Sequence, residues 1–234
     1  MTTFNLTVSR WRFAVGCLLV LLTTTASALQ PFTAEYTVKS GKKSLGTLSV
    51  ELTRSEDNQY VLSATTNPGK LAKMLGSKTS TEVTRFLNTD SGWKLVEFKQ
   101  IRRGRKAGET SVTLVDQRYQ LALDNAVLHN IDGDTAIEPT TYPLATLTSL
   151  KSHLHNKDIM LVRPKGFRAH RYEFLGEEKI SIEDTEYQTE KWQRTETKNP
   201  DRWYEFWIDS TTRQLIKLER IKKGRSSSLV LIPK

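Results

Sequence analysis

Few side chains in this chain have the types and spacing that catalysis or metal binding needs. His153-x-His155 places two imidazoles two residues apart in a predicted helix, where they do not share a face, so we expect no zinc site. Asp132-Gly133-Asp134 resembles the start of a calcium loop, but the later oxygen ligands are missing from the sequence. The sequence therefore predicts a plain turn there and no bound metal.

Signals for an enzyme are equally weak elsewhere in the sequence. The carboxylates of Glu177 and Glu178, beside Lys179, are more typical of a solvated hairpin turn than of a general acid–base pair. The sequence contains no Gly-x-Ser-x-Gly elbow and no phosphate-binding glycine loop. We expect a protein without enzymatic activity and without a cofactor. The enzyme alternative is a hydrolase of envelope polymers, which would need carboxylates brought together from distant parts of the chain.

The N-terminus predicts export. Arg10 and Arg12 precede the apolar residues 13–22, and the tripeptide Ala-Ser-Ala that ends at Ala28 offers small residues to a signal peptidase. We expect residues 1–28 to be a signal peptide, cleaved between Ala28 and Leu29, because the apolar stretch is too short to span a bilayer.

The compartment follows from the cysteine count. The chain has a single cysteine, Cys17, which lies within the apolar stretch of the predicted signal peptide. It lies too early in that stretch for a lipidated cysteine. An exported protein without disulfides is typical of the bacterial periplasm.

The charge balance is basic, with a net charge of +9. Because export separates the protein from nucleic acid, we expect its anionic partners to be phospholipid or lipopolysaccharide headgroups. The alternative is that the charge serves solubility alone.

Two basic clusters lie between predicted strands, where hairpin tips are expected. Charges at such tips discourage edge-to-edge aggregation. If both tips lie at one end of the sheet, they can instead contact an anionic membrane surface. The residues of this hypothesis are Arg102, Arg103, Arg105 and Lys106 around the first turn, and Lys222, Lys223 and Arg225 around the second.

The elements that must position these residues are strands. Short segments such as 32–39 and 44–55 alternate apolar and polar residues and are separated by turn residues, which predicts roughly fourteen strands in an antiparallel meander. A sheet of that width must curl or split. We expect residues 29–234 to form a single all-β domain, an antiparallel meander curled into an open or half-closed β-barrel.

One or two short helices are expected near the mouth of this barrel. Residues 68–78 have the spacing of one or two helical turns. Residues 142–156 are the stronger candidate, because Leu144, Leu147 and Leu150 recur at helical steps after a proline that suits a first helical position. The leucine stripe would dock on the open side of the curved sheet.

The C-terminal half resembles a bacterial exported family that is catalogued as domain of unknown function 3108. The likeness rests on a strand ending in Gly-Glu-Glu at 176–178, a hairpin that returns through Tyr187 to Trp192, and a Trp-x-Asp strand end at Trp207 and Asp209. With the N-terminal strands it covers most of residues 32–221. In this chain Ile216-Lys217 stands where the family usually has a proline.

The resemblance implies a periplasmic β protein and no particular reaction. A curved sheet with helices in its mouth is also similar, more distantly, to lipoprotein carriers of the LolA and LolB type. That second likeness concerns the fold alone.

The segment 202–209 carries large aromatic rings on both of its faces. In an extended chain Trp203 and Trp207 point one way, and Tyr204 and Phe206 point the other. One interpretation is a core on one face and cross-strand aromatic pairs on the other. The alternative is that one set lines an apolar ligand cavity. The residues of the cavity hypothesis are Trp203, Trp207, Phe206, Trp192, Leu147 and Leu150.

The sequence therefore favours a non-enzymatic periplasmic protein that binds an apolar or amphipathic ligand such as a lipid or acyl chain. The alternative is an interaction or scaffold protein of envelope assembly, with a fully packed interior and no ligand. Its protein partner is not indicated by the sequence.

Overall fold

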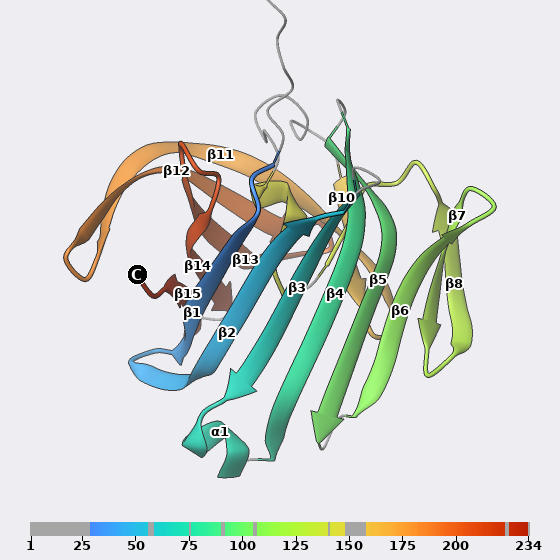
Figure 1. Cartoon of the computed structure of the whole chain (residues 1–234), viewed down its shortest axis with the longest axis horizontal. Coiled ribbons are helices and arrows are strands. Elements are labelled where there is room, and N and C mark those ends of the chain that lie inside the picture. Colours follow the sequence, from blue (N-terminus) through green and yellow to red (C-terminus); the bar gives the residue numbers. More distant parts are fainter. Residues whose placement is uncertain are drawn as a thin grey trace, which may run out of the picture.

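The computed structural model describes residues 29–55, 59–74, 76–89, 92–104, 107–139, 141–147, 158–222 and 225–233. The described residues form one fifteen-stranded sheet in the order β8-β7-β6-β5-β4-β3-β2-β1-β15-β14-β13-β12-β11-β10-β9 (Figure 1). Its strands are β1 (Phe32–Ser40), β2 (Lys43–Arg54), β3 (Gln59–Pro68), β4 (Ser77–Thr89), β5 (Gly92–Gly104), β6 (Gly108–Val115), β7 (Arg118–Leu123), β8 (Ala126–Asp132), β9 (Ile137–Glu138), β10 (Asp158–Arg163), β11 (Gly166–Ile182), β12 (Thr185–Glu196), β13 (Asn199–Asp209), β14 (Leu215–Lys222) and β15 (Arg225–Leu231). The expectation of an open, curled meander is confirmed; the strands pair antiparallel except β9, which pairs parallel with β10.

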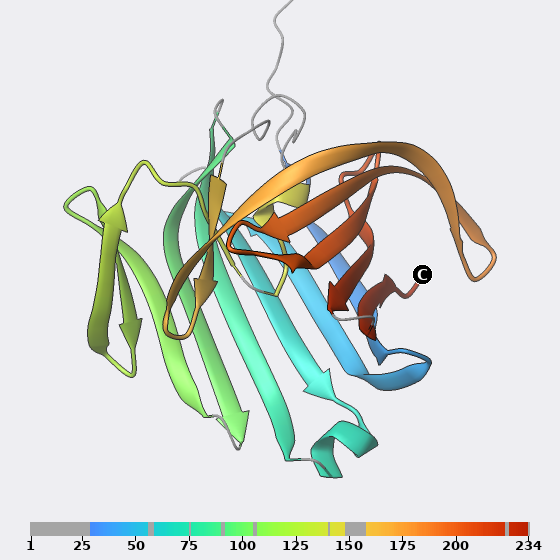
Figure 2. The ribbon, with the colours of Figure 1, turned by 180° about the vertical axis from the view of Figure 1, so that it is seen from behind.

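The sheet rolls until its two halves face each other without closing. Its outermost strands in the described residues are β8 and β9. The indole N–H of Trp93 in β5 donates to the carbonyl of Ile137 in β9 across 2.7 Å, which fastens the rolled edge to the inner face. Beyond this contact β6, β7 and β8 extend the sheet to one side of the rolled part (Figures 1 and 2).

Alternation along the strands decides which face is buried. Tyr36 and Leu48 point inward and have no exposed surface, whereas Ser49 and Glu51 on the outer face of β2 are exposed. Most inward side chains form one apolar core, and a smaller core around Phe98 joins β5, β6 and β7 to β9 and β10. This inward alternation is the pattern expected of a half-buried antiparallel sheet.

The expected helix over 142–156 is found only as a single 3-10 turn, η1 (Leu144–Thr146), in the residues described. Leu144 and Leu147 are buried in the main core, and residues 148–156 of the expected helix lie outside the described residues. Leu150 lies outside the described residues. The other expected helix is α1 (Lys70–Met74), between β3 and β4.

Strand direction places several connections at one end of the sheet. Because neighbouring strands are antiparallel, β1, β3, β5 and β14 all end where α1 lies. The connections that follow β10 and β12 lie there too. We call this end of the strands the α1 end. The strand ends that precede the two predicted basic turns, Gly104 of β5 and Lys222 of β14, therefore lie at the same end of the sheet.

The longest hairpin, β11 with β12, arches over the core (Figure 2). A β-bulge between Phe174 and Gly176 bends it. The sequence prediction that a strand ends at 176–178 and that Glu177-Glu178 forms a turn is wrong, because β11 continues to Ile182 and the turn follows there. The predicted turn at Asp132–Asp134 is confirmed, since the amide of Asp134 donates to Asp132 Oδ1 at 2.9 Å.

Candidate anion-binding site

Two neighbouring rows of inward side chains differ sharply in polarity near the α1 end. Both rows run across β12, β13, β14, β15 and β1 in strict register. The apolar row consists of Trp192, Phe206, Leu218, Leu229 and Val38, and the polar row consists of Arg194, Tyr204, Arg220, Ser227 and Ser40. The inner face of the sheet thus changes from apolar to polar within one step of the pleat.

Arg194 is the centre of the polar part. Its Nη1 donates to Glu138 Oε2 at 2.7 Å, in an ion pair with almost no exposed surface on either side chain. Its guanidinium carbon lies 4.6 Å from the ring centroid of Tyr204 and 5.1 Å from that of Phe206. The aromatic faces and the carboxylate together replace the water that this cation loses on burial.

Glu138 is held by three donors. Tyr172 Oη donates to Glu138 Oε2 at 2.6 Å, and the backbone amide of Ala145 donates to Oε1 at 3.0 Å. Burial is the main cause that raises the pKa of Tyr172, so its phenol stays protonated and acts as a neutral donor. This network connects strand β9 and the η1 segment to the centre of the rolled sheet.

His170, on β11 beside Glu196 of β12, lies at the edge of the same cluster. Its side chain is fully buried, and neither ring nitrogen has a hydrogen-bond partner among the described residues. Burial, followed by the positive charges of Arg194 and Arg163, lowers the pKa of His170 to about 3. The imidazole is therefore neutral at physiological pH.

The cluster holds more guanidinium groups than the carboxylates in contact with it can neutralise. Glu196 forms ion pairs with Arg168 and, at 3.3 Å, with Arg202. In the part of the chain that the structure describes, Arg163 Nε and Nη2 and Arg220 Nε are buried without an acceptor.

This excess of positive charge affects the pKa of the Tyr204 phenol. Burial acts to raise its pKa, but a hydrogen bond with Arg163 and the charges of Arg194 and Arg220 lower it overall.

Such an arrangement can bind an anion. Five arginines gather here against two carboxylates in ion pairs, Glu138 and Glu196, counted over the described residues. A buried donor without an acceptor costs about 1–3 kcal/mol, and more when it is charged. Planar guanidinium forks match the oxygen pairs of carboxylates and phosphates. Arg163, Arg202 and Arg220 keep part of their surface exposed, whereas their donor atoms without an acceptor are buried.

The six residues of the cavity hypothesis do not form one site. Phe206, Trp192 and Leu147 are buried in the main core on the inner face. Trp203 and Trp207 lie on the outer face of β13, with Trp203 half-buried. Leu150 lies outside the residues that the structure describes.

Trp207 explains why β13 has rings on both faces. Only 5% of it is exposed, because the ammonium groups of Lys191 and Lys217 lie 4.8 Å and 4.4 Å from its ring centroid. Its indole N–H donates to Glu178 of β11. Charged side chains of the neighbouring strands cover this tryptophan.

The residues predicted to contact an anionic surface are only partly described. Arg102 and Arg103 lie on β5, and Arg103 is exposed. Lys222 of β14 and Arg225 of β15 lie opposite each other in the backbone register of the two strands. Arg105, Lys106 and Lys223 lie outside the described residues.

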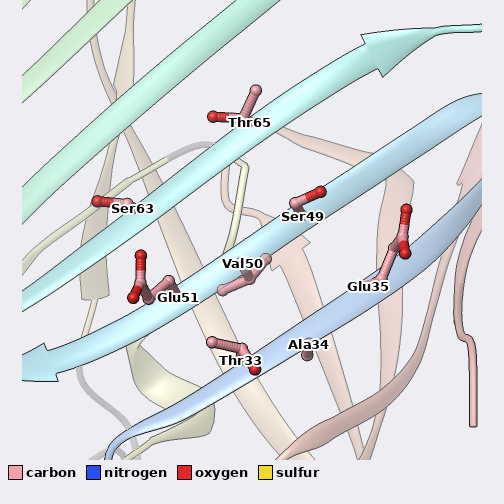
Figure 3. A pocket seen from close by; sticks show the side chains of 8 residues that line it. All are labelled: Thr33, Ala34, Glu35, Ser49, Val50, Glu51, Ser63 and Thr65. Carbon is pink, nitrogen blue, oxygen red and sulfur yellow. The ribbon is translucent and has the colours of Figure 1, made fainter. Parts of the chain in front are cut away.

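The outer face carries one further hollow, of about 410 Å³, over β1, β2 and β3 (Figure 3). Short side chains make it shallow, and the carboxylates of Glu35 and Glu51 stand at its sides. Elsewhere in the described ranges, no group of three or more His, Cys, Asp or Glu side chains is placed to hold a metal ion. None of the described helices is both long and apolar enough to cross a bilayer.

Known proteins support the fold and leave the activity open. No protein-family model matches the chain, so membership of the unknown-function 3108 family remains a prediction. No curated protein matches either. A β-barrel-like protein of domain of unknown function DUF1849 from Brucella abortus aligns with a TM-score of 0.54 at 9% identity, covering 87% of this chain and 96% of that one. The hypothetical lipoprotein YmcC of Escherichia coli K12 aligns with a TM-score of 0.33 at 16% identity, covering 91% and 92%. The fold is β-barrel-like.

Proposed function

We propose that the mature protein is a non-enzymatic periplasmic binding protein, which holds the anionic headgroup of an amphipathic ligand such as a lipid in the arginine cluster. The observation that carries the proposal is the set of buried guanidinium donors without acceptors at Arg163 and Arg220. A phosphate or carboxylate headgroup supplies the missing acceptors and the missing negative charge.

The register of the inner face supports an amphipathic ligand over a simple anion. Next to the polar row lies the row of Phe206, Leu218, Leu229 and Val38, in which Leu229 and Val38 are only half-buried. An acyl chain attached to the bound headgroup can cover this remaining apolar surface. The polar row then fixes the orientation of the ligand, as in most small-molecule sites.

The ligand is best sought in protein that has been exported and purified without detergent. Native mass spectrometry of the intact protein, beside mass spectrometry of an organic extract, should find a stoichiometric lipid with an acidic headgroup. Arg220→Gln should lose it, whereas the matched control Arg118→Gln, at an exposed site on β7, should keep it. A protein that is free of lipid and is not stabilised by added dodecyl phosphate would refute the proposal.

A second function is supported by the interior. Tyr142, Leu144 and Leu147 are buried in the main core, and they fill the concave side of the sheet as the scaffold hypothesis requires. An interaction protein of envelope assembly needs no ligand in that space. Capture of a partner by a protein that carries no lipid would favour this function.

A further inference from the structure

The short helix α1 presents apolar side chains to solvent at the α1 end of the sheet. Leu71 is 53% exposed and Met74 is 84% exposed. Figure 1 shows α1 projecting beyond the ends of the strands. Single exposed apolar residues are common. Here two of them, Leu71 and Met74, lie on one projecting helix and can enter another surface without steric hindrance. We call this pair the peg.

Three cations lie together beside α1. Lys73 of α1, Lys78 of β4 and Arg103 of β5 line a hollow of about 470 Å³ together with Gly76 and Ser77. A close approach of the two segments builds it, because Ser77 pairs with Gly104. A Cβ on Gly104 would lie 3.0 Å from the carbonyl oxygen of Gly76. The backbone contact therefore brings the ends of β4 and β5, and their basic side chains, together.

The segments that build this surface lack acidic residues. The sequence has no Asp or Glu between Asp57 and Glu82, and none between Glu97 and Glu109. The cations near α1 are therefore not neutralised by their own segments. A surface with exposed apolar side chains at its tip and positive charge around them is complementary to an anionic bilayer.

We propose that Leu71, Lys73, Met74, Lys78 and Arg103, the α1 patch, dock the protein on an anionic phospholipid surface. Leu71 and Met74 insert between the headgroups, and the three cations contact the lipid phosphates. The patch shares no residue with the arginine cluster, so docking and ligand binding can fail independently. Both lie at the same end of the sheet, so docking turns the arginine cluster toward the bilayer.

Sedimentation with lipid vesicles tests the proposal. The mature protein should bind vesicles that contain phosphatidylglycerol, should not bind vesicles of phosphatidylcholine alone, and should be released by salt. Each cation near an anionic surface contributes roughly fivefold in partitioning. The triple variant Lys73→Gln/Lys78→Gln/Arg103→Gln should therefore bind about a hundredfold more weakly.

The control variant removes the same charge elsewhere. Lys94→Gln/Arg118→Gln/Lys179→Gln changes three exposed cations on β5, β7 and β11 that lie away from the α1 end, and should bind as the wild type does. An equal loss in both triple variants would show that net charge alone drives binding and would overturn the patch. Failure of the wild type to bind the vesicles would also overturn the proposal, and the α1 patch would then be tested for contact with a partner protein.

A single introduced cysteine gives a direct probe of the insertion of α1 into the bilayer. Since the single cysteine lies at position 17, the mature protein offers no other thiol, and a polarity-sensitive dye on Met74→Cys reports on α1 alone. Its emission should shift to the blue with phosphatidylglycerol vesicles, while the same dye on Lys94→Cys should not respond. An unchanged spectrum at position 74 would overturn the insertion of the peg. Arg220→Gln should leave this shift intact, which separates docking from ligand binding.

Discussion

Glu82 makes the stability of this protein depend on pH in a way that one substitution can isolate. Its carboxyl group is buried on β4, where it accepts hydrogen bonds from Gln100 Nε2 at 3.0 Å and from Thr141 Oγ1 at 2.8 Å. Burial raises its pKa from 4.5 to about 7, against the opposing effect of the hydrogen bonds from Thr141 and Gln100. The folded state therefore holds this proton more tightly than the unfolded chain does.

The sign and the size follow from linkage. The stability that the protonated Glu82 provides is fully present below pH 4.5 and is lost as pH rises through about 7. Each pH unit in that window lowers the free energy of unfolding by about 1.4 kcal/mol, so the whole loss is about 3 kcal/mol. The neutral amide of Glu82→Gln abolishes this loss.

His170 acts in the opposite direction over part of the same range. Its lowered pKa, about 3 in the folded state, means that stability is lost as pH falls from about 6.5 toward 3. The wild-type profile alone thus mixes two opposing slopes. The difference between Glu82→Gln and wild type cancels every group except Glu82.

The assay is urea denaturation of both proteins at several pH values between 4.5 and 8. The variant should gain about 3 kcal/mol relative to wild type across the window from pH 4.5 to 7. A difference in unfolding free energy that stays constant over this range would refute the raised pKa. The double variant with His170→Asn should show the same gain, because the two groups titrate independently.

Three further predictions concern the contacts that hold the roll together. Glu138→Gln leaves Arg194 as a buried cation without its counter-charge, so denaturation should show a loss of about 3–5 kcal/mol; a loss below about 1 kcal/mol would show that water reaches the pair. Trp93→Phe removes the hydrogen bond to β9 and should cost about 1–3 kcal/mol in the same assay, with faster hydrogen exchange confined to β9 and β10; uniform exchange would contradict this role. Gly46→Ala would place a Cβ 2.1 Å from the carbonyl oxygen of Asn67 and should destabilise the protein by more than about 2 kcal/mol, whereas Gly41→Ala, with open space around it, should cost far less.

The strands and their burial could be predicted from the sequence because each depends on local alternation. The side chains of Tyr36 and Leu48 point inward as their period of two requires. Over 142–147 the leucine spacing did not predict the backbone, since Leu144 and Leu147 are buried in the core around a single 3-10 turn, and residues 148–156 lie outside the described residues. A buried segment gives the same apolar signal as an amphipathic helix.

The arginine cluster could not be found in the same way. Arg163, His170, Arg194 and Arg220 come from four strands, and they converge only through the register and bulges of the sheet. One local signal exists in the sequence. In Trp192-x-Arg194-x-Glu196 charged residues continue the inward alternation of an apolar position, which indicates a buried polar network. The sequence predicts a role for the outward-facing Trp207 instead, because aromatic size is visible in a sequence and cation–π contact with lysines of neighbouring strands is not.

The pairing of the first strand with the last has a consequence for how the chain is connected. The sheet order runs from β8 back to β1 and then from β15 back to β9, so among the described strands β1 and β15 are the paired neighbours that are distant in sequence. The two ends of the domain already lie together, since the amide of Ile232 donates to the carbonyl of Glu35 at 2.8 Å. Joining these ends and opening the chain between Asp132 and Ala136 would give a circular permutant whose strands follow one another in space from edge to edge. In that permutant every pair would form between sequence neighbours, so it should fold faster than the natural order, in which β1 must wait for β15.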